Sequence, residues 1–116
     1  MKASLVLIPK ERRCKASLTY FEGGQQQTEE VTIIYRPMSA ATQREFISEV
    51  VGTDGKYQFA DYVARFVVAI PEIVDDAGNP VAITPEFVGQ LSVENVTAIH
   101  NAIEADQNPN PLPPAP

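Results

Sequence analysis

The feature that most constrains the fold is a stripe of large apolar side chains in the middle of the chain. These side chains recur at the i, i+3, i+4, i+7 spacing, which places them on one face of an α-helix: Phe59, Tyr62, Val63, Phe66, Val67 and Ile70. Pro71 follows and lacks the backbone N–H that a helix needs. We therefore expect a helix over residues 59–70 whose stripe is buried in the core.

Three runs rich in β-branched, leucine and aromatic residues precede this helix, over residues 2–9, 14–22 and 29–37. The polar connectors "KERR" and "GGQQQT" separate them. This pattern predicts an N-terminal antiparallel meander of about three strands. With about four helices following it, the fold class is α+β.

The remaining helices are marked by residues that cap helix ends. Ser39 precedes a segment that ends at Gly52, Thr84 precedes Pro85, and Ser92 precedes a last helix reaching Asp106. Serine and threonine oxygens accept hydrogen bonds from the free amides of a first helical turn. The last helix carries a narrow apolar stripe at alternating spacings of about three and four residues: Val93, Val96, Ile99 and Ile103.

Turn-forming and proline-rich segments set the boundaries. The acidic stretch "DDAGN" lies between short apolar runs, which predicts a hairpin-like turn near residues 73–83. The stretch "QNPNPLPPAP" at 107–116 favours an extended, flexible tail. Because the tail begins at residue 107, we expect the 116-residue chain to form one α+β domain over residues 1–106.

Composition narrows the classes of function. The single cysteine leaves no internal disulfide and favours a reducing compartment. The apolar run at residues 2–9 is too short for a signal peptide or a membrane span, so we expect no membrane association. The net charge of -6 is concentrated after Ile70, where seven acids meet no Lys or Arg. That half of the chain repels phosphate backbones, which argues against nucleic-acid binding. Two interpretations of the acidic residues remain: they attract a protein partner, or they form a solvated surface.

No catalytic or cofactor chemistry is apparent in the sequence. Asp75, Asp76 and Asn79 resemble part of a calcium loop, but the ligand positions and the glycine do not match the spacing of such loops. His100 is the only histidine, so a two-histidine metal site or relay within one chain is excluded. Cys14 lies in a predicted strand, without a histidine nearby in the sequence. We therefore expect no catalytic residue, no metal and no cofactor, and a protein that is not an enzyme.

The order of elements resembles a known family. The segment "VTIIYRPMSAATQREF", followed by "FVVAIPEIVDDAGNPVAITPEFVGQLSVENVTAIHNAIEADQNPNP", is similar to the tail assembly chaperones of long, non-contractile-tailed bacteriophages over residues 31–111. The resemblance implies a non-enzymatic protein of the host cytoplasm that leaves the finished virion. It further implies the tape measure protein as client and the major tail tube protein as a second partner. Homo-oligomers along a long client are compatible with it.

A chaperone for an apolar helical client needs an apolar groove with a hydrated rim. We expect the groove to be formed or bordered by Phe87, Val88, Leu91, Val96, Ile99 and Ile103. The acidic rim is expected at Glu86, Glu94, Glu104 and Asp106. The alternative for each apolar side chain is an ordinary core position.

Two other functions fit the same sequence. One is a structural virion protein of the tail or the head-tail junction, and the other is a small adaptor domain of the bacterial host. The position of the gene between those of the major tail protein and the tape measure protein would favour the chaperone.

Overall fold

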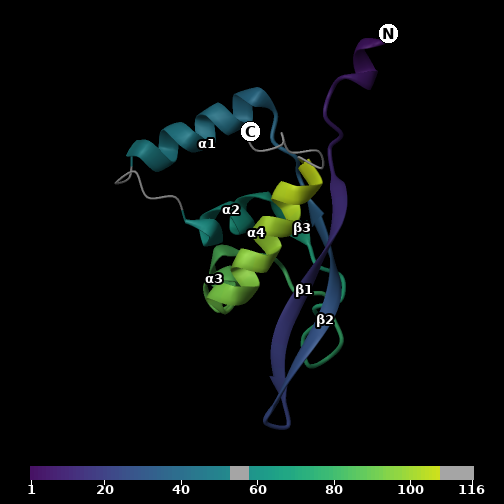
Figure 1. Cartoon of the computed structure of the whole chain (residues 1–116), viewed down its shortest axis with the longest axis vertical. Helices are drawn as coiled ribbons and strands as arrows, with labels where there is room; N and C mark the ends of the chain where they lie inside the picture. Colours follow the sequence, from purple (N-terminus) through teal and green to yellow (C-terminus); the bar gives the residue numbers. More distant parts are fainter. Residues whose placement is uncertain (53–57, 108–116) are drawn as a thin grey trace, which may run out of the picture.

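The computed structural model describes residues 1–52 and 58–107 and confirms the α+β class (Figure 1). Strands β1, β2 and β3 form one antiparallel sheet in that order. In chain order the elements are a 3-10 helix η1 (Ala3–Leu5), β1 (Arg12–Glu22), β2 (Gln25–Tyr35), α1 (Ala40–Gly52), α2 (Phe59–Phe66), β3 (Val67–Ala69), α3 (Pro85–Gly89) and α4 (Val93–Gln107). The predicted tail at 107–116 starts at the last residue of α4 and otherwise lies outside the described residues.

β1 and β2 form a long hairpin that is closed by two glycines. Gly23 and Gly24 have φ angles of +61° and +79°, a region that side chains with a Cβ rarely adopt. Glu22 is paired with Gln25 across this turn. The connector is therefore shorter than predicted, and the glutamine run lies in β2. In Figure 1 the closed end of the hairpin projects beyond the helices.

The third strand is not the one predicted. Residues 2–9 contain η1 and irregular backbone, and their apolar side chains Leu5, Val6, Leu7 and Ile8 are exposed. The third strand is instead β3, which follows α2 and pairs with the end of β2, with Ile34 opposite Ala69.

The predicted helix over residues 59–70 is correspondingly wrong in its last third. α2 ends at Phe66, and Val67 has the extended angles φ -79° and ψ 126°. The backbone N–H of Arg36 donates to the carbonyl oxygen of Phe66 at 2.8 Å. Val67 and Val68 are β-branched and favour strands, so pairing with β2 overrides the helical spacing. The expected burial still holds for Tyr62, Val63, Phe66, Val67 and Ile70.

The core lies between one face of the sheet, α2 and α4. Alternate residues of the hairpin point into it, as the pleat of a strand requires. The hairpin contributes Ala16, Leu18, Val31, Ile33 and Tyr35, and α4 contributes Val96, Ile99 and Ile103. At the end of α4, Asp106 fastens the helix to the sheet. Its carboxylate lies 3.0 Å from Arg12 Nε and accepts a short hydrogen bond from the Tyr35 hydroxyl.

α1 is attached to the rest of the fold through few side chains. Its start is as predicted, since Ser39 Oγ accepts from the Thr42 amide at 3.1 Å. The ring of Phe46 is buried and packs edge-on against Phe66 at 5.6 Å between centroids. Side chains of residues 50–52 lie outside the described part of the chain.

The acidic segment forms the predicted hairpin-like turn. An isolated bridge joins Val74 to Pro80, and Gly78 has a φ of +84°. Asp75 Oδ1 accepts from the amides of Ala77 and Asn79, both at 2.9 Å. One oxygen of this carboxylate is therefore used to hold its own turn.

Candidate functional site

The candidate site is built where α3 and α4 begin, and both starts follow from local sequence. Thr84 Oγ1 accepts from the Phe87 amide at 3.1 Å, and Pro85 occupies the first helical position. Ser92 Oγ accepts from the Asn95 amide at 3.1 Å. Both caps are as predicted. Only residues 90–92 separate α3 from α4, and both helices pack against α2.

An apolar hollow of about 460 Å³ lies between these three helices. α2 contributes Phe59 and Ala60, and the α3–α4 side contributes Val88, Leu91, Val93 and Val96. Its volume falls within the range of about 300–1,000 Å³ that is usual for binding sites. Val93 is 83% exposed, so an apolar side chain stands in water at the edge of the hollow.

Three of the six predicted apolar groove residues line this hollow. Val88, Leu91 and Val96 do so, whereas Phe87 is half-buried beside it. Ile99 and Ile103 are fully buried in the core. Val88 and Val96 are themselves buried in the core, so Leu91 is the one predicted residue that is both partly exposed and part of the hollow.

The four acids predicted for the rim of the groove lie in different parts of the structure. Glu86 and Glu94 are exposed and lie in the first turns of α3 and α4, where the positive end of a helix dipole favours a carboxylate. Glu104 lies farther along α4, with Oε1 4.0 Å from His100 Nε2. Asp106 is half-buried in its contact with Arg12 and Tyr35.

Sequence reasoning missed the half of the hollow that comes from α2. Phe59 was assigned to the core as part of the apolar stripe, and its ring stacks on that of His100 at 3.8 Å between centroids. Val93 belongs to the apolar stripe of the last helix, but it is exposed, unlike Val96, Ile99 and Ile103. As the first residue of α4, it lies beyond the end of the packed stripe. The clue available in the sequence was its place directly after the cap Ser92.

The side chains of His100, Cys14 and Tyr62, which are residue types that often act in catalysis, have structural roles here. His100 is buried, with Phe59 stacked on it and Tyr62 edge-on at 4.9 Å. Burial, with the nearby Asp106 carboxylate, raises the pKa of the Cys14 thiol to about 11, which leaves the thiol protonated at neutral pH. Burial likewise raises the pKa of Tyr62 to about 12. The geometry thus provides no activated nucleophile at these positions.

Within residues 1–52 and 58–107 no group of three or more His, Cys, Asp or Glu side chains is arranged to hold a metal ion. No helix in the same ranges has the length and apolar character needed to cross a membrane.

Comparisons with protein-family models, curated proteins and solved structures found no match to this chain.

Proposed function

We propose that this protein is a tail assembly chaperone of a long, non-contractile-tailed bacteriophage. In this role it binds the tape measure protein, keeps it soluble in the host cytoplasm, helps to recruit tail tube subunits, and is absent from the mature virion. The observation that carries the proposal is the apolar hollow between α2, α3 and α4, with Val93 exposed at its edge.

The shape and lining of the hollow suit the apolar face of a helix. A helix of the client would place side chains at i, i+3 and i+4 against Phe59, Leu91 and Val93. Covering an exposed valine contributes about 1–2 kcal/mol, so several such contacts are needed for stable capture. A long client that offers repeated apolar faces meets that requirement by binding several copies.

Charge selects among apolar helices. From Pro71 onward the chain has seven acids and no Lys or Arg, and Glu86 and Glu94 are exposed on the helices that line the hollow. A client helix with basic residues beside its apolar face is favoured over an acidic one. The attraction is expected to weaken as salt rises.

The test is co-expression with the tape measure protein of the same phage. Val93→Asp adds a carboxylate to an exposed position in the first turn of α4, where it is compatible with the helix. Val74→Asp, at a position 49% exposed in the acidic turn, is the matched control. We expect Val93→Asp to lose the soluble complex and Val74→Asp to retain it.

Retention of the tape measure protein by a folded Val93→Asp variant would overturn the assignment of the hollow. Mass spectrometry of finished virions tests the chaperone role itself. Detection of stoichiometric amounts of this chain in the particle would identify a structural tail or joining protein instead.

A further inference from the structure

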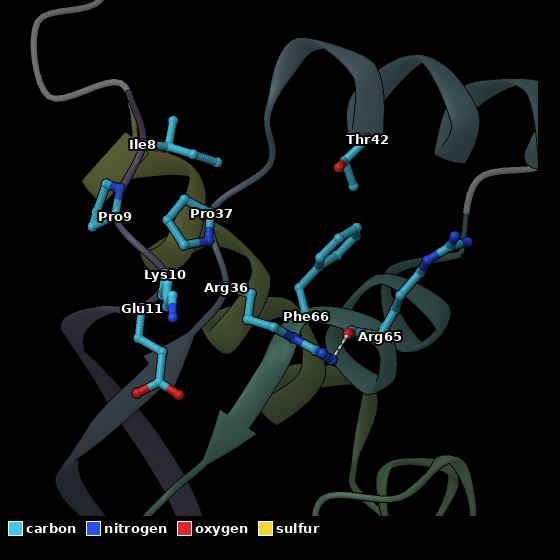
Figure 2. A pocket seen from close by; sticks show the side chains of 9 residues that line it. All are labelled: Ile8, Pro9, Lys10, Glu11, Arg36, Pro37, Thr42, Arg65 and Phe66. Carbon is cyan, nitrogen blue, oxygen red and sulfur yellow. Dashed lines mark hydrogen bonds between the residues drawn. The ribbon is translucent and has the colours of Figure 1, made fainter. Parts of the chain in front are cut away.

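A second and larger cavity lies on another part of the molecule, with a volume of about 650 Å³ (Figure 2). Four segments enclose it: residues 8–11, the connector at Arg36 and Pro37, Thr42 of α1, and the end of α2 at Arg65 and Phe66. It shares no lining residue with the hollow described above. It is therefore a separate site.

Basic side chains outnumber acidic ones in the lining of this cavity. Lys10, Arg36 and Arg65 line it, and Glu11 is the one acid among the lining residues. Figure 2 shows the carboxylate of Glu11 pointing away from Thr42 and Phe66. Thr42 also lines the cavity from the first turn of α1, whose amide at Thr42 is capped by Ser39 Oγ.

The three basic side chains differ in whether they already form a salt bridge or a hydrogen bond. Arg65 forms an ion pair with Glu49. Arg36 donates from Nη2 to the carbonyl oxygen of Arg65 at 2.7 Å, which orients a side chain that has five N–H donors. Within the described residues, no salt bridge is formed by Lys10 or Arg36. These two side chains are therefore available to an anionic ligand.

The surface between the cations is apolar and stiff. Ile8, Pro9, Pro37 and Phe66 supply it, and in Figure 2 the ring of Phe66 points up into the space between Pro37 and Thr42. Phosphate groups are usually held by converging backbone amides or by closely grouped cations. Here the cations come from separate segments around apolar side chains, an arrangement that suits carboxylates placed next to apolar side chains.

We propose that this cavity binds an acidic segment of a partner protein in which carboxylate side chains lie next to apolar ones. The proposal is independent of client binding at the α2–α4 hollow. The chain would then have two docking sites of opposite charge preference, one for a basic apolar helix and one for an acidic peptide.

The probe is a blocked peptide of about six residues in which aspartate and leucine alternate, titrated into the ¹⁵N-labelled full chain. We expect amide shifts to centre on Lys10, Thr42 and Phe66, and affinity to fall several-fold as salt rises from about 50 to about 500 mM. The double variant Lys10→Ala/Arg36→Ala is expected to weaken binding about tenfold. Arg13→Ala, which removes an exposed charge outside this cavity, should bind like the wild type.

Three results would overturn the proposal. The first is equal binding of a peptide with asparagine in place of aspartate, and the second is inorganic phosphate binding as tightly as the peptide. The third is concentration-dependent self-association in sedimentation velocity that the Lys10→Ala/Arg36→Ala variant abolishes, since a second copy would then occupy the cavity.

The two sites are also separable by variant. Val93→Asp is expected to bind the acidic peptide normally, and Lys10→Ala/Arg36→Ala is expected to retain the tape measure protein. Failure of either proposal therefore leaves the other testable.

Discussion

Asn95 connects α4 to the outer edge of the sheet and offers the sharpest test of how the fold holds the candidate site. Its side-chain Oδ1 accepts from the Thr19 amide at 2.8 Å, and its Nδ2 donates to the Thr19 carbonyl oxygen at 2.8 Å. The amide group thus satisfies one donor and one acceptor of β1, as a neighbouring strand would. Asn95 lies two residues after Val93 and next to Val96, so the contact also positions the hollow.

Replacing Asn95 with alanine removes both hydrogen bonds. Each contributes about 0.5–1.5 kcal/mol, or about 2 kcal/mol for the pair. Alanine is the better helix former by about 0.6 kcal/mol, which offsets part of the loss. We therefore expect Asn95→Ala to lower the free energy of unfolding by about 1.4 kcal/mol. The midpoint of thermal unfolding should fall by about 5 °C.

Urea unfolding followed by circular dichroism measures this change, and hydrogen exchange at the Thr19 amide locates it. Glu94→Ala is the control because Glu94 is exposed in the same first turn of α4 and forms no salt bridge within the described residues. Equal stability of the two variants would refute the argument that Asn95 takes the place of a strand partner. Unchanged protection of the Thr19 amide in Asn95→Ala would refute it as well.

Three other predictions follow from the packing and the pKa shifts. Ile99→Ala at a fully buried position should cost about 2–5 kcal/mol in urea unfolding, while Val68→Ala at a partly exposed one should cost under about 1 kcal/mol. The backbone N–H of Thr32 donates to Glu72 at 2.8 Å and, with the Thr32 hydroxyl, holds the pKa of that carboxyl below its ordinary 4.5. This stabilisation is present above pH 4.5 and is lost as the pH falls through the lowered pKa. The stability advantage of the wild type over Glu72→Gln should therefore shrink between about pH 6 and about pH 3. A stability difference that stays constant over this range would contradict the prediction. Because burial raises the pKa of Cys14 to about 11, iodoacetamide at about pH 8 should alkylate the native chain at least about tenfold more slowly than the urea-unfolded chain, and equal rates would refute that reasoning.

The parts of the fold that the sequence predicts correctly are those determined by neighbours in the chain. The caps Ser39, Thr84 and Ser92 each accept a hydrogen bond from an amide three residues ahead, so a short window contains the whole interaction. The turn at Asp75 is local for the same reason. These starts and turns were therefore predictable without knowledge of the tertiary fold.

Errors occur where a distant partner decides the outcome. The helical spacing of residues 59–70 gives no sign that β2 accepts a third strand at Ile34. For the candidate site, the α3 and α4 residues were predictable because they lie close together in the chain. The contribution of Phe59 required knowing that α2 packs beside them.

The N-terminal segment shows how a β-like sequence is used when it finds no strand partner. A strand is stable only where its backbone N–H and C=O groups are paired. At Thr19 the outer edge of β1 bonds to Asn95 of α4, and the last residues of β2 bond to β3 and to the Glu72 carboxylate at Thr32. Residues 2–9 pair with none of the described strands, and residues 8–11 instead form one wall of the cavity with Arg36 and Pro37. That wall carries Lys10, which is where we infer that an acidic peptide docks.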